Sequence, residues 1–355
     1  MRESSSFIEE HYKADTKNIT WKTKKNLVLI IAESLENAYT DKRIFDPIPV
    51  PRLRNLQQVN TFFPQHIQTY GTGWTIAGIT SYMFGIPLKL PIQGNSYTAS
   101  QFLPGANSIL NVMEQAGYSL QFISGWDSRF SGYSNLIATH STGINCDQSF
   151  FQKEGYSLDK FGGSWGFKDS FIFDYAKKML NALHEKHTPY ALIINTVDTH
   201  PPHGFSEEKY RKFNNICDAY ANLDANINDF VAYVLRKDPE NTSIVILGDH
   251  LSMTNDVTQS NLDKIREMRT IYNCFINPYK QPVQTSQMCT SIDMAPTILE
   301  TIGCILPEGR FGLGVSLYSD TPTLVAQDYE QYHSEIPKYS LLYDSFFKPN
   351  KKYDK

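Results

Sequence analysis

The sequence lacks any long run of apolar residues. No stretch approaches the roughly 18 consecutive apolar residues that a membrane-spanning helix requires. The first twenty residues, MRESSSFIEEHYKADTKNIT, also lack the apolar core of a signal peptide. We therefore expect these 355 residues to form a water-soluble domain.

Excess positive charge is absent as well. The chain carries 33 lysines and arginines against 37 acidic residues, for a formal net charge of -4. Such a balance provides no basic field of the kind that attracts nucleic acid. There is no internal repeat, no Pro/Gly-rich linker and no run of amphipathic heptads. We therefore expect a monomeric globular domain without a nucleic-acid partner.

Cysteine is scarce and unpaired in its spacing. The five cysteines are odd in number, widely separated and never arranged as CxxC, which gives no indication of a metal cluster. We expect most of them to be small buried apolar residues, and the spacing leaves one disulfide open. They are Cys146, Cys217, Cys274, Cys289 and Cys304.

Short apolar runs that end abruptly in polar residues are the main structural signal. Such runs are typical of buried parallel strands, and segments with apolar residues at three- and four-residue spacing alternate with them. This alternation predicts an α/β fold, a mostly parallel sheet covered by helices on both faces. The expected strands are 26–32, 119–123, 190–197 and 243–247, and the expected helices are 108–115, 169–183, 218–236 and one within 291–303.

Polar side chains follow three of these predicted strands. Glu33 comes directly after the first strand, Asp198-Thr199-His200 lies at the end of the third, and Asp249-His250 follows the fourth. Ligands of open α/β sheets bind at the carboxyl ends of the strands, so these side chains mark a candidate site. Glu33, Asp249, His250 and the hydroxyl of Thr75 could hold one divalent cation. The alternative is that Glu33 caps a following helix and His250 hydrogen-bonds to the backbone.

Thr75 lies in a loop of small residues, Gly71 to Gly78, which runs into a helical stretch. A hydroxyl at the start of a helix is close to free backbone N–H groups, which favour a bound phosphoryl group and an ionised oxygen. That position suits a nucleophile. It equally suits an N-cap, a role that either Thr72 or Thr75 could fill.

Six motifs occur together in a fixed order: NLVLIIAESLE, GTGWTIAG, GWDSRF, NTVDTHPPHGF, ILGDHLSM and SIDMAPTIL. The set resembles the lipoteichoic acid synthase and phosphoglycerol transferase family, within the alkaline phosphatase/sulfatase-like superfamily. The resemblance spans roughly residues 26 to 302. It is strongest to the phosphoglycerol transferases that decorate envelope glycans, such as the transferase that adds glycerol phosphate to streptococcal wall polysaccharide.

The resemblance implies a role for individual residues. Thr75 corresponds to the nucleophile and to one metal ligand, while Glu33, Asp249 and His250 complete a site that usually holds manganese, with magnesium or zinc as alternatives. Arg129 matches the arginine that binds the phosphate of the donor. His200 matches the histidine across the pocket, a catalytic and substrate-binding residue. Neighbouring polar and aromatic side chains are further substrate-binding candidates: Trp74, Asp198 and His203, with Tyr70 and Asp127 as additional groove residues.

The resemblance also implies the setting of the reaction. We expect phosphatidylglycerol as the donor, an envelope glycan as the acceptor, and a covalent glycerophosphoryl-threonine intermediate. The domain would face the outside of a bacterial cell membrane, held there by N-terminal transmembrane helices that this sequence lacks. We expect residues 1–25 to be a membrane-proximal linker, 26–276 the sulfatase-like catalytic core, and 277–355 a small C-terminal part of the same domain.

Two departures from the family pattern narrow the expected activity. The synthases carry TSD where this chain has Thr75-Ile76-Ala77-Gly78, which favours the decoration of a glycan over the elongation of a polymer. The CxPxR-type sequence of the sulfatases does not surround Thr75. A phosphoethanolamine transferase, a phosphodiesterase or a sulfatase-type hydrolase is the alternative within the superfamily. A non-catalytic glycan-binding module is the alternative from another class.

Overall fold

A six-stranded sheet forms the centre of the protein, in strand order β5-β4-β6-β2-β7-β8. The computed structural model describes residues 3–13, 16–90, 94, 97, 99–253, 260–261, 263 and 268–349. All neighbouring strands of the central sheet run parallel except β8, which is antiparallel to β7. The strands are β2 (Asn26–Ala32), β4 (Ser119–Ser124), β5 (Ile144–Cys146), β6 (Tyr190–Asn195), β7 (Thr242–Gly248) and β8 (Asn273–Ile276).

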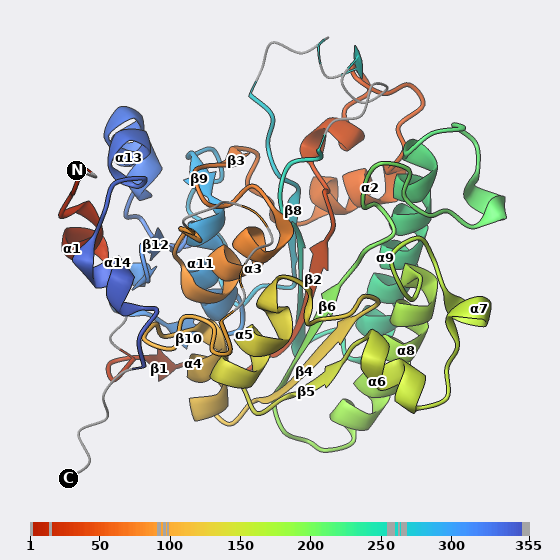
Figure 1. Ribbon diagram of the computed structural model, residues 1–355, viewed down its shortest axis with the longest axis horizontal. Helices are drawn as coiled ribbons and strands as arrows, with labels where there is room; N and C mark the ends of the chain where they lie inside the picture. The colour runs from red at the N-terminus through yellow and green to blue at the C-terminus, as the bar shows by residue number, and fades with distance from the viewer. Residues whose placement is uncertain are drawn as a thin grey trace.

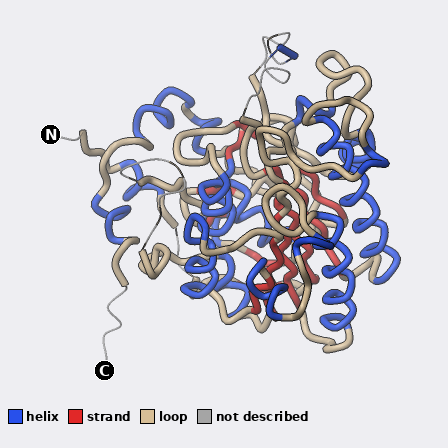
Figure 2. The backbone as a smooth tube through the Cα atoms, turned by 45° about the vertical axis from the view of Figure 1, so that its right-hand side comes forward, coloured by secondary structure: helices blue, strands red, loops and turns tan. Residues whose placement is uncertain are grey.

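Helices cover both faces of this sheet, as Figures 1 and 2 show. Successive residues of β2 point to opposite faces, so that Leu29 joins one hydrophobic core and Ile30 joins the other. One face carries α3 (Thr75–Phe84), α4 (Ile109–Gln115) and α11 (Met294–Thr301). The opposite face carries α2 (Pro51–Val59), α8 (Asp169–His184) and α9 (Cys217–Lys237). The predicted α/β architecture is confirmed.

A second group of elements lies at one side of the central sheet (Figure 1). Two of its two-stranded pairs join segments that are distant in sequence, and the third is a local hairpin. They are β1 (Thr20–Trp21) with β10 (Cys304–Ile305), β3 (His66–Ile67) with β9 (Cys289–Thr290), and β11 (Arg310–Phe311) with β12 (Gly314–Val315). The remaining helices are α1 (Phe7–His11), α5 (Tyr133–His140), α6 (Gln148–Lys153), α7 (Leu158–Phe161), α12 (Leu324–Gln327), α13 (Tyr329–Glu335) and α14 (Leu341–Ser345).

The N-terminal segment packs against the C-terminal part of the chain. Helix α1 contacts α14, and the side chains of Phe7 and Tyr332 meet edge to face at 6.4 Å. Strand β1 adds a backbone ladder with β10. The described residues before Lys25 therefore carry packed elements, where the sequence predicted a linker, because Phe7 and Ile8 are apolar enough to be buried.

All five cysteines are buried and carry free thiols. The expectation of small buried apolar residues is confirmed, and the disulfide that the spacing left open is not formed. No helix within the described ranges combines the length and the apolar character needed to cross a membrane.

Candidate functional site

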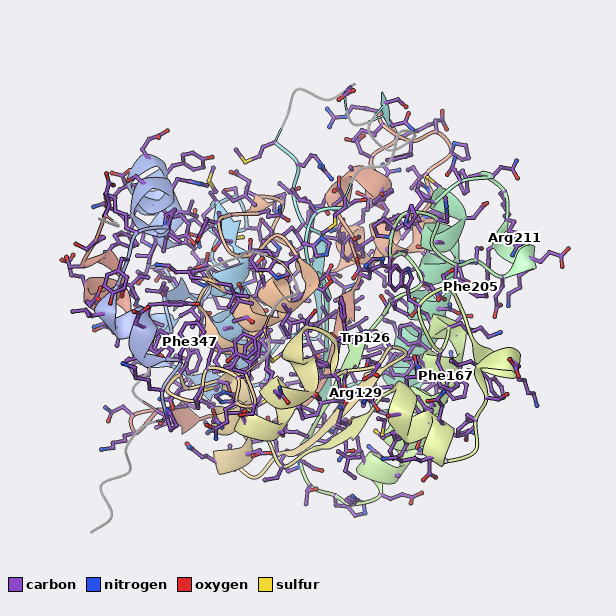
Figure 3. All side chains as sticks on the ribbon, viewed as in Figure 1. Trp126, Arg129, Phe167, Phe205, Arg211 and Phe347 are labelled. Atoms are coloured by element: carbon purple, nitrogen blue, oxygen red, sulfur yellow. The ribbon has the colours of Figure 1, made fainter. Side chains whose placement is uncertain are left out.

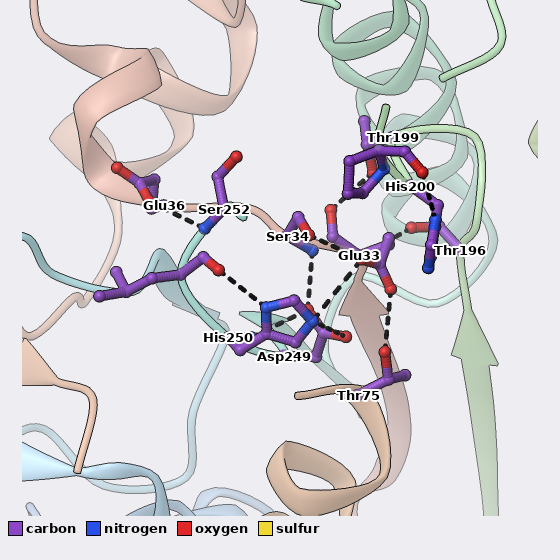
Figure 4. A network of polar contacts seen from close by, with 12 residues as sticks. Glu33, Ser34, Glu36, Thr75, Thr196, Thr199, His200, Asp249, His250 and Ser252 are labelled. Atoms are coloured by element: carbon purple, nitrogen blue, oxygen red, sulfur yellow. Dashed lines mark hydrogen bonds and ion pairs between the residues drawn. The ribbon is translucent and has the colours of Figure 1, made fainter. Parts of the chain in front are cut away.

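The carboxyl ends of β2 and β7 bring three ionisable side chains together (Figure 4). Ala32 lies opposite Gly248 in the parallel register, so that the next residues along each strand, Glu33 and Asp249, leave the sheet side by side. His250 follows at once. All three side chains are buried, with exposed fractions of 1 to 3%. The predicted cluster of Glu33, Asp249 and His250 is therefore assembled by strand order.

Helix α3 carries Thr75 to this cluster. Its first residue is Thr75, and its N-cap, Trp74, makes no side-chain capping bond. The Thr75 hydroxyl donates to Oε2 of Glu33 at 3.3 Å instead. The hydroxyl of Thr72 bonds with the backbone of Thr69, within the preceding turn. Neither threonine caps α3, so the capping interpretation of these residues is wrong.

Two atoms in the cluster have no hydrogen-bond partner within the described chain: Oδ2 of Asp249 and Nε2 of His250. Nε2 lies 3.4 Å from that Asp249 oxygen and 3.6 Å from Oε1 of Glu33. One candidate ligand atom from each of the three residues lies within 4.8 Å of the others. Buried polar atoms are normally paired, so this unpartnered, convergent set fits a divalent cation.

The other ring nitrogen of His250 fixes the orientation of the imidazole. Nδ1 lies 2.8 Å from the carbonyl oxygen of Leu251, which can only accept a hydrogen bond. Nδ1 therefore carries a proton, and in the neutral ring the lone pair of Nε2 points toward the carboxylates. The predicted backbone hydrogen bond of His250 is present, and it leaves Nε2 open toward the carboxylates.

Hydrogen bonds from neighbouring groups hold both carboxylates in place. Oε1 of Glu33 accepts from the Ser34 hydroxyl at 2.6 Å. Oδ1 of Asp249 accepts from the backbone N–H groups of Ser34 at 2.7 Å and of His250 at 2.8 Å. The backbone of Glu33 is fixed by the hydroxyls of Thr196 and Thr199. These bonds orient the Glu33 carboxylate into the cluster, where it caps no helix.

Burial makes the cluster unfavourable without a counter-charge. Burial and the neighbouring Glu33 raise the pKa of Asp249 to about 8. Burial opposes protonation of His250, but the Asp249 and Glu33 carboxylates outweigh it and raise the pKa of the imidazole. The carboxylates of Glu33 and Asp249, which have oxygens within 4.8 Å of each other, repel when both are ionised. A bound divalent cation would relieve this repulsion.

A pocket of about 210 Å³ opens over Thr75. Its wall includes Glu33, Thr75 and, at its rim, His200, whose ring packs on the indole of Trp165 with centroids 4.2 Å apart. Nδ1 of His200 lies 2.7 Å from the carbonyl oxygen of Pro201. The structure thus brings the predicted nucleophile, the metal-ligand candidate Glu33 and the histidine to one pocket, while Asp249 and His250 belong to the buried cluster and are not among the described lining residues.

Arg129 lies outside this pocket in the described structure. Its side chain is 78% exposed, and its guanidinium forms a forked ion pair with Asp127, with 2.9 Å between Nε and Oδ1. Asp127 itself is among the pocket-lining residues. Arg129 and Trp126 lie near each other on the segment that follows β4 (Figure 3). The role of Arg129 in binding phosphate stays a prediction that requires its side chain to turn inward.

The remaining substrate-binding candidates do not line the pocket. Trp74 is buried in the core beneath α3, and His203 is exposed on the loop after His200. Asp198 is buried and accepts from the backbone N–H of Asp169 at 2.9 Å, at the start of α8. This hydrogen bond places Asp198 at the start of α8. The structure shows no hydrogen bond between Asp198 and His200 among the described contacts.

The pocket residues that the sequence analysis did not single out include Trp126, Gln148 and Trp165. Trp126 lies inside the recognised GWDSRF motif and could have been selected as an aromatic beside the arginine. Gln148 and Trp165 lie in segments with no motif. Tyr70, considered as a groove residue, borders a different and larger cavity of about 810 Å³, which contains none of the candidate metal ligands.

Residues 25–304 match the model of the sulfatase family. Phosphoglycerol transferase I of Xanthomonas axonopodis pv. citri (strain 306) is 30% identical over 314 residues, which are 84% of this chain and 43% of that protein. The same-named protein of Escherichia coli (strain 55989 / EAEC) is 29% identical over 334 residues, 90% of this chain and 42% of its own length. The chain thus spans less than half the length of these relatives.

Solved structures share the fold at lower identity. A protein of the alkaline phosphatase superfamily from Vibrio parahaemolyticus has a TM-score of 0.67 at 21% identity, over 85% of this chain and 71% of its own. The lipoteichoic acid synthase LtaP from Listeria monocytogenes has a TM-score of 0.65 at 16% identity, over 86% of this chain and 80% of its own. The zinc complex of the C-terminal periplasmic domain of EcEptC from Escherichia coli has a TM-score of 0.59 at 15% identity, over 86% of this chain and 90% of its own.

Proposed function

The chain belongs to the sulfatase family, and from this premise we propose that it is a metal-dependent transferase that moves glycerol phosphate onto a cell-envelope glycan. One observation carries the proposal. The Thr75 hydroxyl lies at the start of α3, bonded to Glu33 and beside the unpartnered atoms of Asp249 and His250, at the floor of a pocket that His200 borders. This is the arrangement of an activated hydroxyl nucleophile.

Glu33, Thr75, Asp249 and His250 would hold the cation, with manganese as the proposed metal and magnesium or zinc as alternatives. When bound, it would lower the pKa of the Thr75 hydroxyl and offset charge on the phosphoryl oxygens. The bond from Thr75 Oγ1 to Oε2 of Glu33 gives the hydroxyl proton an acceptor. The positive end of the α3 dipole also lies at Thr75, where negative charge develops.

The transfer would proceed in two displacements at phosphorus. Thr75 Oγ1 forms a bond to the phosphorus of phosphatidylglycerol, and the bond to the diacylglycerol oxygen breaks while His200 gives that oxygen a proton. A hydroxyl of the glycan then loses its proton to His200 and attacks the same phosphorus. The bond between phosphorus and Thr75 breaks, and Oγ1 takes back the proton that Glu33 accepted, which regenerates the free threonine. Arg129 would bind the phosphate oxygens after leaving Asp127.

The lining of the pocket suits a glycerol head group. A neutral polyol needs only hydrogen bonds, which Gln148 and Ser131 can supply. Arg129 leaves Asp127 as a free carboxylate when it turns to a bound phosphate, so the choice of glycerol over ethanolamine rests on the names of the relatives and not on the charge of the pocket. A threonine in place of the sulfatase cysteine or serine disfavours sulfate-ester hydrolysis. Intact metal-ligand candidates disfavour a non-catalytic glycan-binding module.

A lipid donor implies a place at a membrane. We propose that the domain works on the extracytoplasmic face of a bacterial cell membrane. This proposal rests on the names of the relatives and on the expectation that residues outside this chain provide the anchor. We also propose residues 26–276 as the catalytic core and 277–355 as the C-terminal part of the same domain; the sulfatase match covers that core and continues to residue 304.

Release of diacylglycerol from vesicles tests the proposal. Wild type and Thr75→Ala are incubated with manganese, an oligosaccharide acceptor, and vesicles of phosphatidylglycerol or of phosphatidylethanolamine. We expect diacylglycerol only from wild type with phosphatidylglycerol, together with glycerol phosphate on the oligosaccharide. Release from phosphatidylethanolamine alone would identify an ethanolamine-phosphate transferase instead. Release without modification of the oligosaccharide would identify a phosphodiesterase.

A further inference from the structure

We propose that Trp165 is the platform on which a sugar ring of the acceptor binds. The inference rests on the proposed glycan transfer and adds a residue that determines acceptor specificity. Trp165 lies in the loop between α7 and α8, where its side chain is 48% exposed and lines the mouth of the pocket over Thr75. Ligand pockets are lined predominantly by hydrophobic and aromatic side chains, and Trp165 is an aromatic lining residue that is also open to solvent.

The loop that carries Trp165 is held in place by close backbone contacts. A Cβ atom at Gly166 would lie 2.2 Å from the carbonyl oxygen of Gly125, which accepts from the Phe167 N–H at 2.8 Å. Gly166 also has a φ of +147°, a conformation that other residues rarely adopt. On the opposite side, the Ser164 hydroxyl donates to the carbonyl oxygen of Gly204 at 2.8 Å. The indole is therefore presented by a loop fixed between the segments that follow β4 and β6.

The position of Trp165 beside His200 connects it to the acceptor. The ring planes of the two residues are inclined by 50°, with centroids 4.2 Å apart. In the proposed mechanism, His200 takes the proton from the entering hydroxyl, so that hydroxyl must lie within hydrogen-bond distance of the imidazole. The sugar ring that bears the hydroxyl then lies over the neighbouring indole. One face of a pyranose presents C–H bonds, which pack well on the electron-rich face of an aromatic ring.

Trp126, the other indole of the pocket, is less suited to this role. It is partly buried against the hydrophobic core, and its ring packs on Tyr133 with centroids 5.3 Å apart. Trp126 therefore belongs to the buried wall of the pocket, whereas Trp165 is its solvent-exposed indole. An acceptor that enters after diacylglycerol has left would meet Trp165 first.

The two halves of the reaction allow a specific test. The glycerophosphoryl group is first loaded onto Thr75 with phosphatidylglycerol, and the rate of loading is followed by intact mass. The loaded protein is then mixed with buffer alone or with an oligosaccharide, so that either water or a sugar hydroxyl takes the group. For Trp165→Ala we expect unchanged loading and unchanged loss to water, but transfer to the sugar slowed roughly three- to ten-fold. Trp165→Phe should recover part of this loss.

Helix α13 offers a matched control. Its Tyr329 is 37% exposed and packs on His333 with centroids 4.3 Å apart, a pair like that of Trp165 and His200 but outside the lining of the pocket. Tyr329→Ala should leave all three rates unchanged. If Trp165→Ala slows loss to water as much as transfer to sugar, Trp165 acts by positioning His200 and the inference is overturned. If wild type is never loaded, the proposed function fails, and this inference fails with it.

Discussion

Replacement of Gly78 by alanine should displace the nucleophile from the metal ligands. Gly78 lies in the first turn of α3, three residues after Thr75, and a Cβ atom there would lie only 2.0 Å from the carbonyl oxygen of Asp249. Ordinary van der Waals contact needs about 3.5 Å, so the helix and the strand end must separate by about 1.5 Å. A displacement of about 1 Å can cost about 100-fold in rate when it affects reacting groups.

Helix propensity and packing change the stability of Gly78→Ala in opposite directions, so a measured free energy of unfolding distinguishes between them. Glycine to alanine in a helix favours folding by about 1 kcal/mol, whereas overpacking at a buried contact costs about 1–3 kcal/mol. We expect Gly78→Ala to lower the free energy of unfolding in urea and to slow loading of Thr75 about 100-fold or more.

Gly117 provides the matched control for this experiment. It has a φ of +88°, and a Cβ atom added there would meet no other atom within 4 Å, so Gly117→Ala should cost about 1–2 kcal/mol through backbone strain alone. Its loading rate should stay at the wild-type level. The packing argument would be refuted if Gly78→Ala loaded Thr75 at the wild-type rate and kept or increased the free energy of unfolding. That result would mean that α3 and Asp249 tolerate the added Cβ atom.

Three further changes should have separate signatures. A divalent cation at 100-fold above its Kd should stabilise the 355-residue protein by about 2.7 kcal/mol, or ~4 °C in Tm, and Asp249→Asn should abolish this shift in a thermal melt. His200→Gln should slow loading and transfer by about 100-fold or more, measured by quenched intact mass, without loss of cation binding. Burial raises the pKa of Asp169 to about 7, and burial together with Asp169 raises the pKa of Asp198 well above its usual range. Because the folded protein holds these protons more tightly than the unfolded chain does, its free energy of unfolding should fall as the pH rises from about 4 toward 7. In Asp198→Asn, urea unfolding should show a smaller fall across this window.

The sequence predicted the sheet well because its strands are continuous apolar runs. Residues 26–32 were expected as a strand and form β2 with the same limits, since a strand covered on both faces needs no alternating polar residues. Glu33 and Asp249 were recognisable as strand-end residues for the same reason. Their adjacency depends on the order of the strands, and only the resemblance to known motifs indicated that order.

Sequence patterns did not predict the contacts between loops that are distant in sequence. Trp165 reaches the pocket because Gly125 and Gly166 allow two backbones to touch, and no local signal marks that contact. The pairing of Asp127 with Arg129 is local, yet it depends on side-chain rotamers that a motif does not specify. The hydrogen bond of Asp198 with the start of α8 joins residues that are 29 apart in the sequence, so no local pattern predicts it.

Intact mass after incubation with manganese and phosphatidylglycerol tests the central claim most directly. Wild type should gain the mass of one glycerophosphoryl group, located on Thr75 by peptide mapping, and Thr75→Ala should gain none. A single experiment thus reports the donor, the nucleophile and the covalent intermediate. The proposed mechanism would be contradicted by an adduct of equal yield on Thr75→Ala, or by no adduct on wild type although calorimetry shows the cation to be bound.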